Sequence, residues 1–469
     1  MSYPLKEISA GELARQKEIM ARVAAANAAL AEPPLAMVDT YGCQQNEADS
    51  EKIRGMLHEM GYVFTDSETD ADLIVINTCA VREHAEMRVL GNVGALTHTK
   101  RAKPGQLIAL CGCMVTQEHM AEKVKRSYPI VDLVFGTHEL YRFPELLEQT
   151  LTPHKGRVFS VRQIDGERVE GLPSYRTGSV KAWLSVMYGC NNFCSYCVVP
   201  YVRGRERSRR AADVLEEALR LVDLGYKEIT LLGQNVNSYG KDLEEGHDFA
   251  YLLEEINKLP GEFVVRFMTS HPKDATPRLI DTMAACEKVE RHIHLPFQSG
   301  SSRVLKAMNR GYTREQYIAL AERFREKILG VAVTSDVIVG FPGETEAEFE
   351  ETLSLVELLR FDMLFTFIYS PRKGTPAARM PDPFTREEKQ KWFDRLLAAQ
   401  SRISGETQAA HVGKDYRVLI DGVNAEGKLT ARTPCNRLVQ LEGDRALVGS
   451  FADVTITGST TWSLSGEIR

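Results

Sequence analysis

Residues 189–197 read GCNNFCSYC and directly follow a strand-like run at Val180–Tyr188. The spacing C-x3-C-x2-C brings three thiols into one short loop, so they can bind three irons of one cubane cluster and leave the fourth iron without a protein ligand. A zinc site usually needs four ligands, often as paired C-x2-C units, and no obvious fourth Cys or His lies nearby in the sequence. A structural zinc knuckle is the alternative, but we predict an iron–sulfur cluster with an open iron at Cys190, Cys194 and Cys197.

A second set of cysteines is dispersed over the region that precedes this loop. Each member follows a different predicted strand, and the set consists of Cys43, Cys79 and Cys113. The carboxyl ends of parallel strands lie along one edge of an open sheet, so residues far apart in sequence can converge there on a second cluster. Each cysteine alone would more often be a core thiol, and Cys111 is the rival of Cys113 that we assign to the core. Packing is also our interpretation of Cys286 and Cys435.

The order of apolar runs predicts an α/β protein with three parts after an N-terminal helix. Residues 34–152 alternate strands and helices and indicate a small doubly wound parallel sheet. Residues 176–406 repeat that alternation six times, which predicts a partial (βα)6 barrel that ends in an amphipathic helix. Short alternating runs between turn residues over 409–469 predict a small β-barrel. Residues 1–33 are expected to form an accessory helix with a capping box at Ser9–Glu12 and no chemistry.

The apolar runs predict the bounds of the individual elements. Strands are expected at 35–41, 72–77, 106–110 and 131–135 in the first part, and residues 151–178 are expected to be a connector. In the central part, strands are expected at 180–188, 228–232, 263–268, 292–295, 331–339 and 363–368, and a helix at 385–410. In the C-terminal part, strands are expected at 416–420, 438–441, 446–448 and 452–456.

Composition and charge exclude several classes of protein. The 469 residues contain 43% hydrophobic and 26% charged residues, an ordinary globular balance, and the net charge is −6. Bulk charge therefore does not indicate a nucleic-acid partner, and any such surface must be a local patch. The charged residues within 1–32 exclude an apolar signal core or a membrane span. Nine cysteines, an odd number without a secretory signal, indicate a reducing, cytoplasmic location, and we expect a monomer.

Polar and glycine residues follow the other predicted strands of the central part. Loops at the carboxyl ends of barrel strands are where a site is built, and amides, hydroxyls and close backbone approach can hold a polar cofactor. Turn chemistry explains any one of these loops, but their common placement around the cysteine loop favours a site. The candidates are Gln234, Asn235, Ser270, His294, Gln298, Gly340 and Pro342.

One basic run follows the cysteine loop, with five arginines between Arg203 and Arg210. The guanidinium group suits phosphate because it can bind two oxygens at once, although a solvated helix entry explains the run about as well. In the C-terminal barrel, seven basic residues are balanced by seven acidic ones, so an RNA contact there must come from one face. The RNA-binding candidates are Arg203, Arg205, Arg207, Arg209, Arg432, Asn436 and Arg437.

These features together resemble the methylthiotransferases of the radical S-adenosylmethionine superfamily, from about residue 34 to the end. That family has an N-terminal domain, a radical core and a C-terminal TRAM domain. Tyr41–Asn46 (YGCQQN), Asn191–Arg209 (NNFCSYCVVPYVRGRERSR) and Gly233–Gly240 (GQNVNSYG) are similar to the branch that modifies N6-isopentenyladenosine in tRNA. Gln45 replaces the more familiar Met of that pattern. Branches that act on a ribosomal protein or on threonylcarbamoyladenosine tRNA are alternatives, which GQNVNSYG disfavours.

The resemblance implies two [4Fe–4S] clusters and S-adenosylmethionine as cofactors. Cys190, Cys194 and Cys197 would hold the cluster that cleaves S-adenosylmethionine to a 5′-deoxyadenosyl radical, which takes hydrogen from carbon 2 of the adenine. The dispersed set, Cys43, Cys79 and Cys113, would hold the auxiliary cluster that carries the sulfur. The implied partners are the tRNA anticodon stem-loop and an electron donor such as flavodoxin or ferredoxin. A non-catalytic zinc protein that binds RNA is the remaining alternative.

Overall fold

The chain divides into two compact units in the computed structural model, which describes residues 7–80, 83–152, 156–162 and 166–469 and the side chains among them except at 83–85. The first unit comprises Met1–Thr177, Met187–Asn191 and Val198–Arg209, and the second comprises Gly178–Val186, Asn192–Cys197 and Arg210–Arg469. The sequence predicted consecutive segments at 34–152, 176–406 and 409–469. The division into compact units places residues on both sides of the cysteine loop in the first unit.

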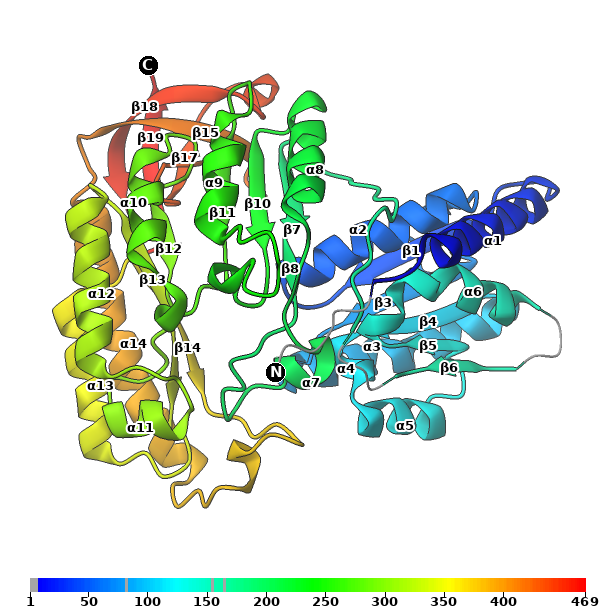
Figure 1. The fold of residues 1–469 in the computed structure, drawn as a ribbon, viewed down its shortest axis with the longest axis horizontal. Coiled ribbons are helices and arrows are strands. Elements are labelled where there is room, and N and C mark those ends of the chain that lie inside the picture. Colours follow the sequence, from blue (N-terminus) through cyan, green and yellow to red (C-terminus); the bar gives the residue numbers. More distant parts are fainter. Residues whose placement is uncertain (1–6, 81–82, 153–155, 163–165) are drawn as a thin grey trace. The chain divides into compact units, whose positions relative to one another are not determined.

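The first unit contains a parallel sheet with the strand order β2-β1-β3-β4-β5-β6 (Figure 1). Its strands are β1 (Leu35–Thr40), β2 (Val63–Phe64), β3 (Leu73–Thr78), β4 (Leu107–Gly112), β5 (Leu133–Phe135) and β6 (Val158–Ser160). β3 is buried along its whole length, as its unbroken apolar sequence predicts for a central parallel strand. The doubly wound parallel sheet expected from the sequence is therefore confirmed.

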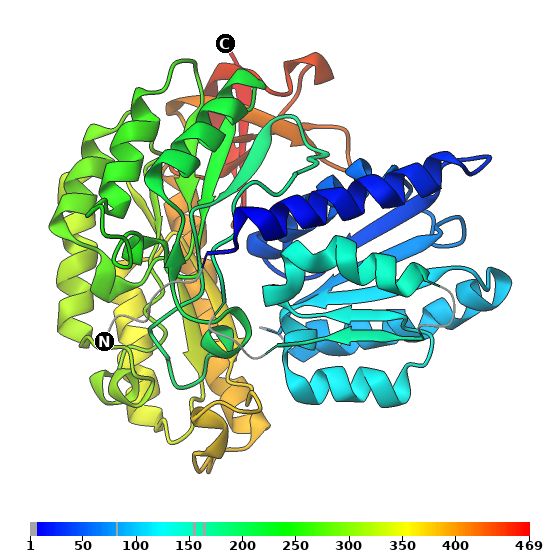
Figure 2. The same cartoon turned by 45° about the vertical axis from the view of Figure 1, so that its right-hand side comes forward.

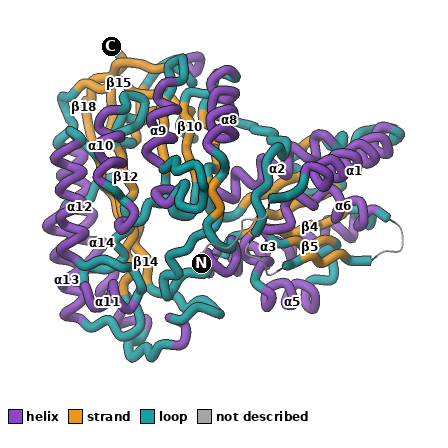
Figure 3. The backbone as a smooth tube through the Cα atoms, viewed as in Figure 1, coloured by secondary structure: helices purple, strands orange, loops and turns teal. Residues whose placement is uncertain are grey.

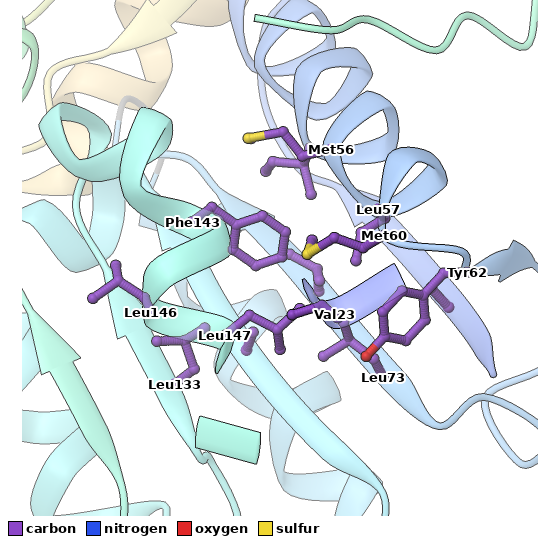
Figure 4. Packing of buried hydrophobic residues seen from close by; sticks show 14 of the residues in the cluster. Val23, Met56, Leu57, Met60, Tyr62, Leu73, Leu133, Phe143, Leu146 and Leu147 are labelled. Atoms are coloured by element: carbon purple, nitrogen blue, oxygen red, sulfur yellow. The ribbon is translucent and has the colours of Figure 1, made fainter. Parts of the chain in front are cut away.

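Helices cover both faces of this sheet. They are α1 (Ala10–Ala28), α2 (Gln44–Glu59), α3 (Glu83–Ala102), α4 (Cys113–Thr116), α5 (Glu118–Ser127), η1 (Thr137–Arg142) and α6 (Phe143–Leu151). One core joins α1, α2 and α6 to one face through residues such as Met56 and Phe143, as Figure 4 shows. A second core joins α3, α4 and α5 to the opposite face through Val89, Met114 and Val124. The unit also includes a small hairpin-like pair, β8 (Met187–Tyr188) with β9 (Arg207–Ser208), and helix α7 (Val199–Arg203).

The N-terminal helix is part of this unit rather than an accessory extension. Ile19, Met20 and Val23 of α1 are buried in the core that also contains α2 and α6, and Figure 2 shows α1 in dark blue along the sheet. Its predicted N-cap is present, because the Ser9 side chain accepts a hydrogen bond from the Glu12 backbone N–H. Among the described residues, no helix has both the length and the apolar character that crossing a membrane requires.

The predicted connector contains one strand that the sequence did not reveal. Val158–Ser160 forms β6 and pairs in parallel with β5. Its three residues lie between charged and glycine-containing stretches, so the apolar run is too short to stand out. Residues 153–155 and 163–165 of the connector lie outside the described part of the chain.

The second unit contains a partial barrel of parallel strands in sequential order. Its strands are β7 (Lys181–Ser185), β10 (Glu228–Leu232), β11 (Val264–Phe267), β12 (His292–His294), β13 (Ala332–Val339) and β14 (Met363–Ile368). They form the sheets β11-β10-β7 and β12-β13-β14, which a parallel bridge between Val265 and Val289 connects. The sequence predicted all six strands within a few residues.

Helices accompany these strands along the outside of the barrel. They are α8 (Ala211–Asp223), α9 (Phe249–Lys258), α10 (Pro277–Ala285), α11 (Ser302–Ala307), α12 (Arg314–Lys327), α13 (Glu346–Leu359) and α14 (Arg386–Ala409), with the short turns η2 (Val236–Ser238), η3 (Pro272–Asp274) and η4 (Ala377–Arg379). Side-chain caps fix the first residue of several of these helices. Thr313, Thr345 and Thr385 each form a full capping box with the Gln or Glu three residues later.

A closed five-stranded barrel ends the chain, with the order β15-β16-β17-β19-β18, and Figure 3 shows its strands in orange near the C-terminus. The strands are β15 (Asp415–Val423), β16 (Leu429–Arg432), β17 (Leu438–Leu441), β18 (Phe451–Ser459) and β19 (Leu464–Ile468). The strand expected at 446–448 is wrong, because Asp444 caps a 3₁₀ turn, η5 (Arg445–Leu447), by accepting from the Ala446 N–H at 2.9 Å. β16 and β19 were not predicted from their short runs.

Candidate functional site

The dispersed cysteines lie at three neighbouring strand ends of the first unit. Cys43 follows β1, Cys79 follows β3 and Cys113 follows β4. The Asn46 side chain lies among them, with its Oδ1 4.0 Å from the Cys43 Sγ and 3.9 Å from the Cys113 Sγ. Its Nδ2 donates to the carbonyls of Tyr41 at 2.8 Å and Thr78 at 3.0 Å, which ties the first strand end to the second. The structure therefore brings these strand ends together around one buried amide.

Two glycines allow the backbones at these strand ends to approach each other. Gly42 has a φ of +128°, and a Cβ there would lie 2.7 Å from the Cys79 Cβ and 3.1 Å from its Sγ. Gly112 has a φ of +93°, and a Cβ there would lie 2.3 Å from the Asn77 Oδ1. Any larger residue would push the strand ends apart, so both glycines are requirements of the cysteine arrangement.

A buried arginine contacts the Cys113 thiol. The Arg203 Nε donates to the Cys113 Sγ at 3.1 Å, while its two terminal nitrogens bind Asp49 at 2.6 Å and the Asn46 Oδ1 at 2.7 Å. Burial raises the pKa of Cys113 to about 12, and the Arg203 charge opposes this shift. A thiol in this setting becomes a thiolate when a positive group binds its sulfur, which fits the donor set of an iron cluster.

Cys111 belongs to the core, as expected from the sequence. It is buried in the cluster that contains Leu133 and Phe135, and burial raises its pKa well above the usual value. Cys113 instead contacts Ala80, Val198 and Val202. Within the described ranges, no three His, Cys, Asp or Glu side chains are close enough to hold a single metal ion. A cubane has a wider span because each thiolate binds a different iron.

The cysteine loop is held locally by hydrogen bonds to its backbone. In the first unit, the Cys190 N–H donates to the Gly204 carbonyl at 3.1 Å. In the second unit, the Cys197 N–H donates to the Cys194 carbonyl at 2.9 Å, and the Ser195 N–H donates to the Met308 carbonyl at 3.0 Å. Phe193, between the first two cysteines, has a φ of +45°, a conformation that is uncommon for a side chain of its size.

A second buried arginine contacts the Cys194 thiol. The Arg310 Nη1 donates to the Cys194 Sγ at 3.3 Å, the Nη2 donates to the Pro296 carbonyl at 2.7 Å, and the Nε donates to the Tyr312 hydroxyl at 3.0 Å. Its side chain is 5% exposed. Arg310 lies in the turn after α11, more than a hundred residues from the loop that it contacts.

Several buried polar atoms at the ends of β10 and β11 have no hydrogen-bond partner in the described structure. They are the Asn235 Oδ1, both amide atoms of Asn237, the Ser270 Oγ and the His271 Nε2. Burial, and then the charges of Arg310 and two lysines, lower the pKa of His271 to about 2, so it is a neutral ring. Thr269, a β-branched residue, has a φ of +66°, and such strain often occurs at binding sites. Since buried polar atoms normally have partners, this group fits a polar ligand such as S-adenosylmethionine.

The other candidates for cofactor binding differ in burial and in their hydrogen-bond partners. His294 is buried, with its Nδ1 3.0 Å from the Thr334 hydroxyl, and Gln298 is buried with a φ of +68°. The Gly340 N–H donates to the Glu344 carboxylate at 2.6 Å, and a Cβ at Gly340 would lie 2.4 Å from the Lys389 side chain. Pro342 is buried beside this loop and Gln234 is half-buried. Their contact with a cofactor stays a prediction.

The structure contradicts four of the RNA-binding candidates. Arg203, Arg207, Arg209 and Arg437 are 6–7% exposed, so their guanidinium groups are not available to phosphate. Arg203 binds Asp49, Arg207 donates to two backbone carbonyls, Arg209 binds the Glu170 carboxylate, and Arg437 binds Asp362 and the Gln408 side chain. The alternating sequence of the arginine run did not show which side of the chain faces the interior.

The remaining RNA-binding candidates are more exposed. Arg205, Arg432 and Asn436 are half-buried. The Arg432 Nε lies 3.5 Å from the Asp421 carboxylate, and Asn436 has a φ of +64° in the turn before β17. They stay candidates for an RNA contact.

Sequence reasoning missed four residues of these sites. Asp49 and Arg310 are ordinary charged residues in the sequence, and only the fold shows that they contact Arg203 or Cys194. Asn237 and His271 lie inside loops that were singled out, but neither was chosen. Asn46 was quoted in YGCQQN, and its position three residues after Cys43, on the first turn of a helix, was the available signal.

Comparison with known sequence families gives three matches. The profile of the radical SAM superfamily matches residues 184–356, that of the uncharacterized protein family UPF0004 matches residues 36–136, and that of the TRAM domain matches residues 409–468. Together these matches account for most of the chain.

Individual relatives are similar over nearly the whole chain. A tRNA-2-methylthio-N(6)-dimethylallyladenosine synthase of Acetivibrio thermocellus is 50% identical over 467 residues, covering 98% of this chain and 97% of that protein. A protein of the same name from Alkaliphilus oremlandii is 50% identical over 434 residues, 92% of each chain. Among solved structures, the radical S-adenosylmethionine methyltransferase TsrM of Kitasatospora setae has a similar fold, with a TM-score of 0.54 at 16% identity over 73% of this chain and 77% of that one.

Proposed function

Because this chain belongs to the tRNA-2-methylthio-N(6)-dimethylallyladenosine synthase family, we propose that it adds a methylthio group to carbon 2 of N6-dimethylallyladenosine beside the tRNA anticodon. It is a radical SAM enzyme, so it uses S-adenosylmethionine and a [4Fe–4S] cluster. The full-length identity favours this substrate over a ribosomal protein or threonylcarbamoyladenosine tRNA.

The observation that carries the proposal is the presence of two separate cysteine sets with three thiols each. Transfer of a methylthio group needs a radical generator and a sulfur donor. The loop with Cys190, Cys194 and Cys197 would serve the first role. The strand-end set with Cys43, Cys79 and Cys113 would hold the second cluster, because Asn46 lies close to two of its thiols and Gly42 permits the approach of the third.

When bound, the cluster and S-adenosylmethionine supply a radical, which an unactivated C–H bond requires because acid–base chemistry cannot break it. The protein's own groups bind and orient. Arg203 and Arg310 donate hydrogen bonds to the sulfur atoms of Cys113 and Cys194, and would orient these thiolates as ligands of a bound cluster. Asn237, Ser270 and the neutral His271 offer donors and acceptors for the polar groups of S-adenosylmethionine.

The tRNA contact requires the target base to leave its stack, because a base inside a stacked loop does not expose carbon 2 to a pocket. Arg205, Arg432 and Asn436 are the proposed contacts to the anticodon stem-loop. A low-potential electron donor such as flavodoxin or ferredoxin, a monomeric state and a cytoplasmic location complete the proposal.

The test uses anaerobically reconstituted full-length protein with S-adenosylmethionine, a reductant and tRNA from a strain that lacks the modification. We expect mass spectrometry of the nucleosides to show a gain of one methylthio group on N6-dimethylallyladenosine. Iron and sulfide analysis should give two four-iron clusters in the wild type and one in each triple Cys→Ala variant.

The two variants provide the internal control. The C190A/C194A/C197A variant should neither cleave S-adenosylmethionine nor modify tRNA. The C43A/C79A/C113A variant should still cleave S-adenosylmethionine to 5′-deoxyadenosine but transfer no sulfur. If this second variant kept eight irons, the assignment of the strand-end cysteines would be wrong. If the wild type, fully loaded with iron, left the tRNA unchanged, the substrate assignment would fail.

A further inference from the structure

Each cysteine site contains one buried arginine whose guanidinium donates to a cysteine sulfur. Arg203 donates to Cys113 at 3.1 Å in the first unit, and Arg310 donates to Cys194 at 3.3 Å in the second. Both side chains are about equally buried, at 6% and 5% exposure. Both contacts therefore place a guanidinium group at a cysteine sulfur. A difference in net charge between the two sites must come from the other partners of each arginine.

The counter-charges of the two arginines differ. Arg203 forms a buried ion pair with Asp49 at 2.6 Å, and the Asp49 side chain is only 8% exposed. Arg310 binds a carbonyl and the Tyr312 hydroxyl, and no carboxylate within the described residues forms an ion pair with it. Lys273 adds a second cation to the cysteine loop, because its ammonium group binds the Asn192 side chain. Arg203 thus has a carboxylate partner, whereas Arg310 has none among the described residues.

This difference matters for electron uptake. A four-iron cluster with three thiolate ligands gains one negative charge when it is reduced, and its potential depends on nearby charge and on hydrogen bonds to its sulfurs. A buried positive charge stabilises the extra electron, and the effect is stronger in a protein interior than in water. An arginine paired with a carboxylate contributes its hydrogen bond but little net charge.

We propose that Arg310 and Asp49 direct the electron to the cluster of Cys190, Cys194 and Cys197, here called the radical cluster. Arg310 raises the reduction potential of that cluster. At the auxiliary site, formed by Cys43, Cys79 and Cys113, Asp49 cancels the same effect of Arg203. The inference rests on the proposed function, in which both cysteine sets hold clusters. One electron from a low-potential donor protein, or from dithionite in vitro, reduces the radical cluster from the 2+ to the 1+ state. A cluster held by Cys43, Cys79 and Cys113 would then stay in the 2+ state, with its open iron available for sulfur.

The roles assigned to these residues are those of positioning groups. Arg310 and Asp49 touch cluster ligands or a ligand-bound arginine, and neither contacts the reacting carbon. The chain buries an ion pair at one site, whereas at the other it buries an arginine with no carboxylate partner among the described residues. Burying such a cation costs free energy, which an effect on the cluster potential accounts for.

The experiment is an anaerobic redox titration of holoenzyme followed by electron paramagnetic resonance, with the two triple Cys→Ala variants to assign each signal. We expect Asp49→Asn to favour reduction of the auxiliary cluster at least tenfold, a shift of +59 mV for one electron. Arg310→Gln should disfavour reduction of the radical cluster at least tenfold, and Arg310→Lys should restore most of the wild-type value. Each change should leave the other cluster at its original potential.

Surface variants control for the change in total charge. Glu148→Gln in the first unit and Arg417→Gln in the second remove one charge from exposed ion pairs and should leave both potentials unchanged. If Asp49→Asn moves the auxiliary potential no more than Glu148→Gln does, the proposal is wrong, and this holds even if the Arg310 variants fail to load a cluster. If both clusters titrate normally but the tRNA is not modified, the proposed function fails and the electrostatic assignment stands.

Discussion

The two sets of cysteines are brought together in different ways. At the site in the first unit, three strand ends that are up to seventy residues apart converge on Asn46, so the site depends on the register of the whole sheet. At the other site, three cysteines lie within eight residues, and the loop is held by a few backbone hydrogen bonds such as the one from Ser195 to Met308. The first site should therefore fail when its sheet is disturbed, while the second should depend mainly on local contacts.

The charges around the two arginines also make the first site the more sensitive one to substitution. Asp49 and Arg203 form a buried ion pair that is built into the packing of the first unit, whereas the partners of Arg310 are neutral. Removing one member of a buried pair leaves the other charge without compensation, while removing a neutral partner loses one hydrogen bond. Three pairs of matched substitutions test this comparison.

The largest effect is expected for Asp49→Ala, which leaves Arg203 charged and buried. The free energy of unfolding of the first unit should fall by about 3–5 kcal/mol, the usual cost of breaking a buried ion pair. Tyr312→Phe, which removes the hydroxyl that accepts from Arg310, should cost only about 1 kcal/mol in the second unit. Amide hydrogen exchange of the apoprotein in urea, measured separately for peptides of α2 and α12, reports both values. Equal losses at the two sites would contradict the contrast.

The sequence predicted more of the loop site than of the strand-end site, because only contacts between residues close in the chain can be seen in the sequence. The loop cysteines were assigned from spacing alone, because their proximity is local. The strand-end cysteines needed the additional assumption of a parallel sheet, which β1, β3 and β4 confirm. Asp49 and Arg310 could not be predicted, because a charged residue in a helix or turn is normally exposed and only packing buries it.

The arginine run also shows that the sequence does not reveal which charged residues are buried. Arg203, Arg207 and Arg209 looked like a phosphate-binding surface, but they alternate along the chain and face the interior of the first unit. In the C-terminal barrel, β17 was predicted to the residue, while β16 and β19 were missed, since closing a barrel recruits short segments that have little intrinsic signal.

An intermediate effect is expected from His138, which shares the environment of Arg203. Burial, and then the charges of Arg207, Arg203 and Arg162, lower the pKa of His138 to about 3. The unfolded chain takes up a proton near pH 6.5 that the folded chain cannot bind, so stability is present above that pH and declines as the pH falls toward 3. Between pH 7 and pH 5, the free energy of unfolding should fall by about 2 kcal/mol because of this residue.

His138→Gln removes that contribution and should flatten the dependence of unfolding free energy on pH in the first unit. Urea unfolding of the apoprotein at pH 7 and pH 5, for wild type and variant, measures the difference. The matched variant in the second unit is His271→Gln, because burial and Arg310 lower the pKa of His271 to about 2. It should flatten the pH dependence of that unit instead. A His138→Gln variant with the full wild-type slope would mean that His138 is hydrated in solution.

The smallest effect on stability is expected for Cys111→Ala, which tests whether Cys111, the last but one residue of β4, is a core thiol. Cys111 packs with Leu133 and Phe135 on the face that α1, α2 and α6 cover, so the loss of one sulfur atom should cost about 1 kcal/mol and no iron. Cys113→Ala, two residues later, should abolish the auxiliary cluster, because its sulfur lies by the Asn46 amide and the Arg203 guanidinium. Iron analysis and urea unfolding of both variants distinguish a core thiol from a ligand. Iron lost from the Cys111 variant at unchanged stability would exchange the roles of Cys111 and Cys113.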